Sequence, residues 1–295
     1  MSEEARTTQQ QVWFITGSSR GFGRALVTAV LDAGDLVVAT ARRPEPLAAE
    51  LAEYGDRVLT VPLDVTDPAA AQAAIDAALA RFGRIDVLVN NAGYANVSPV
   101  ETSDDADFRA QFETNFWGVY HVTKAALPAL RRQGSGTVVQ FSSVGGRVGG
   151  SPGIASYQAA KFAVDGFTRA LATETAPFGI RYLVVEPSGF ATDWAGASMT
   201  AHPVPEAYDQ TVGAMNRRMR QGEAGAAGDP ERAAEIIVRT VRGGELPSHL
   251  LLGVNAVTMA LEYSRRQLAE ATAWEQVSRS ADFAEPYPVE LPAAR

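Results

Sequence analysis

The sequence predicts a single-domain α/β fold in which helices flank a doubly wound parallel sheet. Short apolar runs alternate with stretches of helical periodicity along most of the 295 residues, which is typical of repeated βα units. Glycines crowd the turn after the first apolar run, as they do where such sheets bind ligands. The length suffices to bury one large core, and no internal repeat occurs beyond the βα alternation.

The composition excludes several functional classes. A net charge of -8 and the absence of a Lys/Arg cluster argue against a nucleic-acid-binding surface. There is no cysteine, which excludes disulfides and thiolate chemistry. The three histidines are too scattered for a metal centre: His121, His202 and His249. Residues 1–11 form a polar tail unlike a signal peptide, and no apolar run approaches the roughly 20 residues of a membrane span. We expect a soluble, cytoplasmic protein without a membrane partner.

The first half of the chain predicts four strands. The run VWFITG at 12–17 is the first, and the following helix ends at Gly34. LVVATA at 36–41 is the second strand and completes a βαβ unit. The remaining elements are the third strand at 57–67, an Ala-rich helix that ends at Gly83 and the fourth strand at 85–93.

The second half predicts three more strands. The expected elements are a long helix at 104–133, a strand at 136–143, a small-residue loop, a helix from Ser156 to Gly179, a strand at 180–189, an irregular segment at 190–228, a helix capped by Asp229 with Pro230 in its first turn, and a last strand at 248–257. The domain is therefore expected to span 12–257, and residues 258–295 to form a C-terminal helix and tail.

The turn after the first strand has the pattern TGxxxGxG, with Gly17, Gly21 and Gly23. Glycine lets the backbone approach a ligand closely, and the N-terminus of the next helix offers unpaired N–H groups to a pyrophosphate. Tight packing alone also favours glycine, so this pattern is a modest signal until other motifs join it.

The end of the second strand bears on the choice of dinucleotide. NAD-binding units usually carry Asp or Glu here for the ribose 2′-hydroxyl, whereas this chain has Ala41 followed by Arg42 and Arg43. Arg20, in the glycine turn, can approach the same place. A guanidinium clamps a 2′-phosphate through two charge-assisted hydrogen bonds. We expect NADP(H); arginines that simply face solvent, with NAD(H) as the cofactor, are the alternative.

Three further polar positions are candidates for the same site. Asp64 ends the third strand and is expected to accept a hydrogen bond from an adenine amine. The NNAG motif at 90–93 ends the fourth strand, where open α/β sheets bind ligands. Asn115 lies inside the long helix, where Asn fits poorly by propensity, so a kink or a bound water is expected there.

Tyr157 and Lys161 form the candidate catalytic pair. They are four residues apart and therefore share one face of a helix. An ammonium beside a phenol favours phenolate, which lowers the tyrosine pKa from about 10 and makes a general acid or base. Ser142 and Ser143 end the preceding apolar run and can deliver a hydroxyl to the same place. A solvent-facing Tyr and Lys on an ordinary helix are the alternative.

Seven motifs now stand in order along the chain: TGSSRGFG, LDVTD, NNAG, Asn115, Ser143, YQAAK and EPSGFAT. Together they resemble the short-chain dehydrogenase/reductase family, of the shorter single-domain type, over residues 12–257. The resemblance implies a Rossmann-like sheet and oxidoreductase activity.

Two departures from the family pattern affect the site. The catalytic Ser usually lies thirteen residues before the Tyr, at Val144 here, whereas Ser143 lies fourteen before. One extra residue is therefore expected within 149–152, and Ser142 remains an alternative. Ser188 also stands where the family commonly has Gly, although Thr192 keeps its spacing from Pro187.

The resemblance implies a role for each matched residue. Tyr157 exchanges a proton with the substrate oxygen, and Lys161 binds the nicotinamide ribose and lowers the tyrosine pKa. Ser143 holds the substrate oxygen, and Asn115 holds a water that links Lys161 to solvent. The implied cofactor-binding residues are Gly17, Ser19, Arg20, Gly21, Phe22, Gly23, Arg42, Asp64, Val65, Asn91, Ala92, Gly93, Tyr157, Lys161, Pro187, Gly189 and Thr192.

We therefore expect an NADP(H)-dependent enzyme that interconverts a ketone and a secondary alcohol. An NAD(H)-dependent alcohol dehydrogenase is the nearer alternative. A non-catalytic NADP(H) sensor is the alternative of another class, and it would need the glycine turn but not the Ser, Tyr and Lys set.

The substrate and the assembly are predicted indirectly. Residues 190–228 are expected to form a lid, and Trp194, Met199, Met215 and Met219 favour a hydrophobic ketone, although Met215 and Met219 also suit plain core packing. Family members are often dimers or tetramers through two long helices, so a homodimer or homotetramer is expected. The residues expected in that contact, or in the core, are Phe116, Trp117, Phe162 and Phe167.

Overall fold

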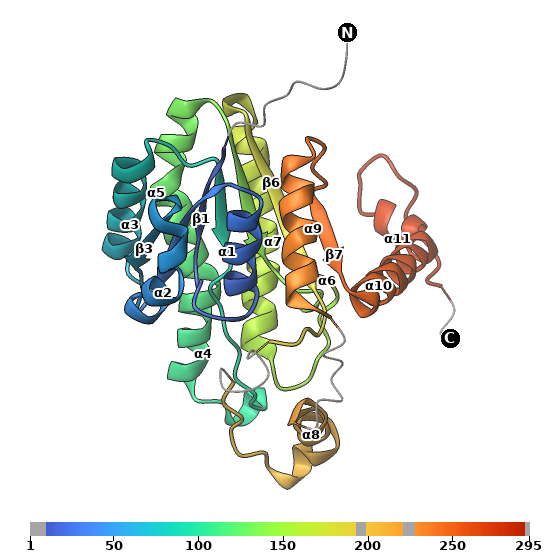
Figure 1. Ribbon diagram of the computed structural model, residues 1–295. Coiled ribbons are helices and arrows are strands. Elements are labelled where there is room, and N and C mark those ends of the chain that lie inside the picture. The colour runs from blue at the N-terminus through green and yellow to red at the C-terminus, as the bar shows by residue number, and fades with distance from the viewer. Residues whose placement is uncertain (1–9, 193–198, 221–227, 293–295) are drawn as a thin grey trace.

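The computed structural model describes residues 10–192, 199–220 and 228–292 (Figure 1). Within them a seven-stranded parallel sheet has the order β3-β2-β1-β4-β5-β6-β7. Its strands are β1 (Val12–Ile15), β2 (Leu36–Ala41), β3 (Val58–Pro62), β4 (Val87–Asn90), β5 (Gly136–Phe141), β6 (Ile180–Pro187) and β7 (His249–Leu252). The strand order reverses between β1 and β4, which confirms the predicted doubly wound sheet.

Helices cover both faces of the sheet, as Figure 1 shows. On one face lie α1 (Gly21–Asp32) and α9 (Pro230–Arg242); on the other lie α3 (Pro68–Phe82), α5 (Gly118–Gln133) and α7 (Ala155–Thr175). Side chains alternate along each strand, so Trp13 packs toward α1 and α9, whereas Phe14 packs toward the opposite layer. Each large apolar side chain that is buried in this way contributes about 1.5–3 kcal/mol. The two cores hold the strand ends, and hence the site, in place.

Further helices, most of them short, connect these elements or follow the last strand. They are α2 (Glu45–Glu50), η1 (Ala52–Arg57), η2 (Val100–Thr102), α4 (Asp105–Phe112), the π-helical turn η3 (Glu113–Trp117), α6 (Gly145–Val148), η4 (Ala176–Phe178), η6 (Glu206–Tyr208), η7 (Asp209–Gly213), α8 (Ala214–Arg220), α10 (Val254–Ala273) and α11 (Glu275–Arg279).

The predicted helix ends are confirmed where a specific residue caps them. The Asp229 carboxylate caps α9 by accepting a hydrogen bond from the Glu231 N–H at 2.9 Å. Pro230, which has no N–H to be satisfied, occupies the first turn of α9. Gly83 and Gly179 end their helices in the left-handed conformation, with φ of 75° and 67°, which glycine adopts without strain.

The structure corrects three local predictions. The last strand ends at Leu252, and the residues expected to extend it to 257 instead begin α10 after Gly253 turns the chain at a φ of 91°. The segment at 190–228 is not irregular throughout, because residues 206–220 are helical. The small-residue loop after β5 contains α6, since the Ser143 and Val144 carbonyls accept hydrogen bonds from N–H groups three or four residues later.

The C-terminal helices project from the body of the molecule (Figure 1). Of the twenty residues in α10, two are buried, Ala256 and Ala260, both near its start. The boundary expected at 257 thus falls inside α10. None of the helices in the described parts of the chain has the length and apolar character needed to cross a membrane.

Candidate active site

The glycine turn and the NNAG motif meet at the carboxyl end of β1 and β4. A Cβ on Gly23 would lie 2.2 Å from the Gly17 carbonyl oxygen and 2.5 Å from Asn91 Nδ2, so only glycine fits there. Gly17 has a φ of 67°, and a Cβ on it would lie 3.0 Å from the Ala92 Cα. The turn is therefore built for close approach of backbone to backbone, directly before the N-terminus of α1.

Thr16 and Asn91 hold this turn together. The Thr16 hydroxyl accepts from the Asn91 N–H at 2.9 Å and from the Ala92 N–H at 3.0 Å. In return, Asn91 Nδ2 donates to the Thr16 and Gly17 carbonyls at 2.9 and 3.1 Å. The Asn91 amide thus contacts the turn itself, and its predicted contact with the dinucleotide stays a prediction. Sequence reasoning missed Thr16, although a hydroxyl at the end of a strand before glycine was a usable signal.

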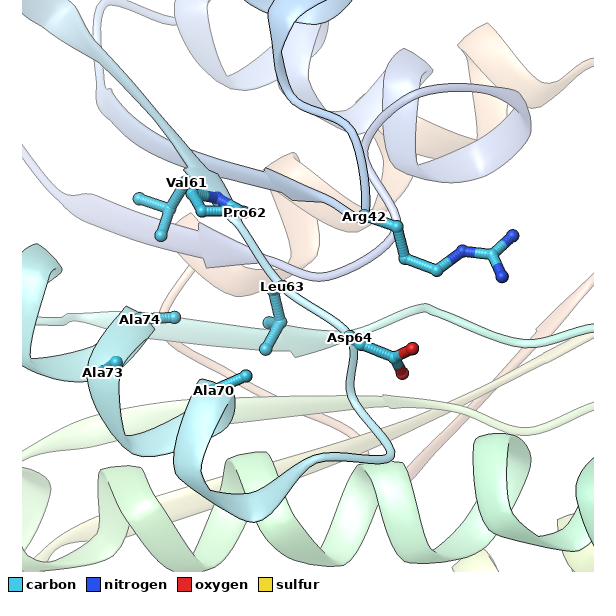
Figure 2. A pocket seen from close by; sticks show the side chains of 8 residues that line it. All are labelled: Arg42, Val61, Pro62, Leu63, Asp64, Ala70, Ala73 and Ala74. Carbon is cyan, nitrogen blue, oxygen red and sulfur yellow. The ribbon is translucent and has the colours of Figure 1, made fainter.

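The end of β2 carries no carboxylate, and the 2′-phosphate site expected there stays a prediction. Ala41 is buried, and the two residues that follow it, Arg42 and Arg43, have exposed side chains. Arg20, in the glycine turn, is exposed as well. Figure 2 shows the side chains of Arg42 and Asp64, which project from the chain just after β2 and β3. Together with residues of β3 and α3, they line a hollow of about 560 Å³.

Asp64 is held as a carboxylate at this edge. Its oxygen accepts from the N–H and the hydroxyl of Thr66, at 3.0 and 2.8 Å. These two hydrogen bonds, with a smaller contribution from the Arg42 charge, lower the pKa of Asp64 below its usual value. A carboxylate accepts hydrogen bonds, and the predicted contact of Asp64 with an adenine amine stays a prediction.

Asn115 lies in the π-helical turn η3, between α4 and α5, and is completely buried. Its Nδ2 donates to the carbonyls of Tyr94 and Gln111, both at 2.7 Å, and its Oδ1 accepts from the Tyr94 N–H at 3.2 Å. The amide thus ties the segment after β4 to the irregular helix turn, which is the local distortion that its poor helix propensity predicted. A Cβ on Gly93 would lie 2.6 Å from Asn115 Oδ1 and 3.5 Å from Lys161 Nζ, so Gly93 admits both side chains.

Tyr157, Ser143 and Lys161 come together where β5 meets α7. Tyr157 and Lys161 are 7% and 3% exposed, which excludes the alternative of solvent-facing side chains. The Ser143 hydroxyl is hydrogen-bonded to the Tyr157 phenol, accepts from the Gly145 N–H at 3.0 Å and lies 3.5 Å from the Pro187 carbonyl oxygen. The Ser142 hydroxyl instead donates to the Lys161 carbonyl at 3.2 Å. The geometry therefore favours Ser143 over Ser142 as the hydroxyl that acts with Tyr157.

The predicted lowering of the tyrosine pKa is wrong for this arrangement. Burial raises the pKa of Tyr157 to about 12, against which the Ser143 hydrogen bond acts. Burial lowers the pKa of Lys161 to about 8. Lys161 Nζ donates to the Phe141 carbonyl at 2.7 Å and lies 5.6 Å from the centre of the Tyr157 ring, and burial is the largest cause of the raised tyrosine pKa. The site holds a protonated phenol through neutral pH.

The segment after β6 reaches the same place. A Cβ on Gly21 would lie 3.4 Å from Thr192 Cβ, and the Phe22 and Phe190 rings pack with centres 4.8 Å apart. The predicted residues Pro187, Gly189 and Thr192 therefore run from the Ser143 contact to the glycine turn. Glycines at 149, 150 and 153 all have positive φ, so the loop between α6 and α7 can take up the extra residue that the spacing predicts.

The segment that was expected to form a lid packs against the apolar cluster that includes Tyr157, and its action as a lid stays a prediction. Met199 and Met219 pack against a buried apolar cluster that includes Val97, Ile154 and Tyr157. Ala201 forms a β-bridge with Val97, which docks this segment against the chain after β4. Trp194 lies outside the described residues.

Three of the four aromatic residues that were expected at a subunit contact, or in the core, pack together: Phe116, Trp117 and Phe167. The Phe116 ring packs against Trp117 and Phe167 at 5.3 and 6.1 Å, while Trp117 and Phe162 remain 40% and 42% exposed. Self-association through this surface stays a prediction. Within the described ranges, no three His, Asp or Glu residues are placed to hold a metal ion.

Comparisons with known proteins agree with this geometry. The family model for short chain dehydrogenase matches residues 11–202. Oxidoreductase BOA17 of Botryotinia fuckeliana is 46% identical over 269 residues, which cover 91% of this chain and 98% of that protein. A short-chain dehydrogenase structure from Streptomyces avermitilis is 40% identical, with a TM-score of 0.85 over 92% of this chain and 100% of its own.

Two more distant structures carry dinucleotides. One is a 3-ketoacyl-(acyl-carrier-protein) reductase from Brucella melitensis complexed with NADH, which is 27% identical with a TM-score of 0.69 over 82% of this chain and 96% of its own. The other is an alcohol dehydrogenase from the archaeon Thermococcus sibiricus complexed with 5-hydroxy-NADP, 26% identical with a TM-score of 0.67 over 83% and 96%. The family model, the relatives and the site geometry agree, and the chain belongs to the short-chain dehydrogenase/reductase family of oxidoreductases.

Proposed function

We propose that this oxidoreductase is an NADP(H)-dependent reductase of a hydrophobic ketone, which in reverse oxidises the secondary alcohol. The observation that carries the proposal is the buried Tyr157 phenol, which is hydrogen-bonded to Ser143 and lies beside Lys161, close to the carboxyl end of β5. The names of the Brucella and Thermococcus structures, a ketoacyl reductase and an alcohol dehydrogenase, support this type of reaction.

The residues fit a dinucleotide. Gly23 lets the turn pack tightly, because a Cβ there would lie 2.2 Å from the Gly17 carbonyl oxygen. The start of α1 supports pyrophosphate binding, since the N–H groups at a helix N-terminus favour an anion. Arg20 and Arg42 are exposed cations beside a strand end without a carboxylate, which supports binding of a 2′-phosphate. Asp64 is suited to the adenine amine. When bound, the dinucleotide supplies the hydride.

The protein's own side chains supply the proton that the carbonyl oxygen takes up during reduction. Tyr157 keeps its proton at neutral pH, since burial raises its pKa to about 12, so it is suited to donate that proton to a carbonyl oxygen during reduction. Ser143 is placed to donate a second hydrogen bond to the same oxygen and to stabilise the charge that develops there. Lys161, with its pKa lowered to about 8 and within the same buried space as Asn115, can return a proton toward Tyr157.

The apolar cluster around Tyr157 supports the substrate class. Tyr157 shares a buried apolar cluster with Val97, Ile154 and Val212, against which Met199 and Met219 pack. A charged substrate group would be desolvated against this surface. A medium or bulky apolar ketone suits this surface better than a small keto acid.

Dinucleotide titration and a ketone panel test the proposal. We expect NADPH to bind more tightly than NADH and to be oxidised with hydrophobic ketones, as followed by its absorbance. Tyr157→Phe should abolish turnover and leave NADPH binding within about threefold, because the hydroxyl is lost while the glycine turn is intact. Saturation by NADH alone would favour the NAD(H) enzyme. Unchanged turnover in Tyr157→Phe would overturn the proposed chemistry, and binding without turnover on any ketone would favour a sensor.

A further inference from the structure

A buried ion pair lies next to the site and has no part in the chemistry proposed above. Arg147, on α6, donates from Nε to both carboxylate oxygens of Glu186, on β6, at 2.8 and 3.1 Å. The two side chains are 24% and 1% exposed. A carboxylate buried to this degree is costly unless it is paired, so the position of Arg147 is tightly constrained.

The ion pair spans the junction at which the Ser143 hydroxyl is placed. Arg147 lies one helical turn after Ser143, and its N–H donates to the Val144 carbonyl at 3.0 Å. Glu186 directly precedes Pro187, whose carbonyl oxygen accepts from the Val144 N–H at 3.0 Å and lies 3.5 Å from Ser143 Oγ. The ion pair and the Ser143 contact therefore join the same two segments.

The short helix α6 needs such support. It has four residues, two of which are Gly145 and Gly146, and a single glycine-containing turn is not stable by itself. Gly146 cannot be replaced by a stiffer residue, because a Cβ there would lie 2.5 Å from Ser142 Oγ and 2.8 Å from Lys161 Cβ. The chain after α6 continues through Gly149 and Gly150, both with positive φ.

We propose that Arg147 and Glu186 are positioning residues, which clamp α6 to the end of β6 and thereby hold the Ser143 hydroxyl against Tyr157. The inference rests on the proposed function, because it assigns the pair to the same proton-transfer site. It predicts that weakening the clamp lowers kcat more than it weakens substrate binding, since a misplacement of about 1 Å can cost on the order of 100-fold in rate.

The two partners differ in what their removal leaves behind. Burial raises the pKa of Glu186 and the Arg147 hydrogen bond opposes this, while the charges of His249 and Asp165 act on it in opposite directions. Arg147→Met leaves a buried carboxylate without its partner and should lower stability. Glu186→Gln keeps the side-chain volume and an acceptor oxygen for Arg147, so it weakens the clamp with a smaller loss of stability.

A second ion pair of similar burial provides a matched control. Arg242 NH1 lies 2.6 Å from Asp35 Oδ2, with side chains 22% and 1% exposed. Asp35 directly precedes β2, at the amino ends of the strands, whereas the site lies at their carboxyl ends. Asp35 also accepts a hydrogen bond from Trp13 Nε1 at 3.2 Å. Arg242→Met should therefore lower stability as Arg147→Met does, without moving any group near Tyr157.

The experiment compares kcat, KM, NADPH affinity and melting temperature for the wild type, Arg147→Met, Arg147→Lys, Glu186→Gln and Arg242→Met. We expect kcat to fall about 10- to 100-fold in Arg147→Met, with KM and NADPH affinity within about threefold, and to recover in part in Arg147→Lys. Arg242→Met should keep the wild-type kcat despite a lower melting temperature.

Two outcomes separate this inference from the proposed function. A wild-type protein that turns over no ketone contradicts the proposed function itself. An active wild type with equal kcat in Arg147→Met and Arg242→Met overturns the positioning role alone. Should Arg147→Met fail to fold, Glu186→Gln decides: a reduced kcat at near-native stability supports the clamp, and an unchanged kcat contradicts it.

Discussion

Substitution of Lys161 by methionine tests the energetic consequence of burying an ammonium group in the site. Burial lowers the pKa of Lys161 from 10.5 to about 8, so the unfolded chain holds this proton over a pH range in which the folded protein releases it. Wild-type stability therefore rises with pH between about 8 and 10.5, and the free energy of unfolding gains about 3 kcal/mol in total from this one group. Lys161→Met has no such group. The stability of the wild type minus that of Lys161→Met should rise by about 2.5 kcal/mol between pH 7 and pH 10.

Urea unfolding at constant ionic strength measures this difference, provided that the slope against urea is the same in both proteins. The raised pKa of Tyr157 gives a loss of stability above pH 10 in both proteins, so it cancels in the comparison. Lys124→Met is the matched control, because Lys124 also lies over an aromatic ring, at 5.3 Å from the Tyr120 centre, but is exposed. A wild-type minus Lys161→Met difference that stays flat from pH 7 to pH 10, or equals that of Lys124→Met, would refute the reasoning.

Two further predictions concern the dinucleotide site. Arg42→Ala should weaken NADPH binding by about 10- to 100-fold, as expected for loss of charge-assisted hydrogen bonds, and leave NADH binding unchanged in calorimetric titration; equal weakening of both would contradict a 2′-phosphate contact. Gly23→Ala should abolish binding of both dinucleotides, since its Cβ would lie 2.2 Å from the Gly17 carbonyl oxygen, whereas Gly34→Ala, with no atom within 4 Å of its Cβ but a φ of 85°, should lower stability only. Retained affinity in Gly23→Ala would show that the turn can relax.

The fold and much of the site could be predicted from the sequence, because those features depend on local patterns. The βα alternation predicted the sheet, and the spacing of Tyr157 and Lys161 predicted one helix face, which α7 confirms. The poor fit of Asn115 to a helix predicted a distortion, and the π-helical turn is that distortion.

Other features depend on long-range contacts that no local pattern encodes. The tyrosine pKa was predicted in the wrong direction, because the spacing of two residues does not show how deeply both are buried or that Lys161 would donate to the Phe141 carbonyl. The role of Thr16 depends on two N–H groups about 75 residues later in the chain. The extent of the last strand was overestimated, because LLLGVNAV is apolar apart from Asn255, and Gly253 marks the change to a helix.

The strand order gives the site a place in the folding sequence of the chain. Thr16 and the glycine turn meet the NNAG motif only after β1 has paired with β4, which lies more than 70 residues later. Ser143 is placed only after β5 has paired with β6, whose end also holds Pro187. Parallel pairing across such separations is slow, because the chain must close long loops before any contact rewards it. We therefore expect helix formation and hydrophobic collapse to precede assembly of the site, and dinucleotide affinity to be among the last properties that the folding chain acquires.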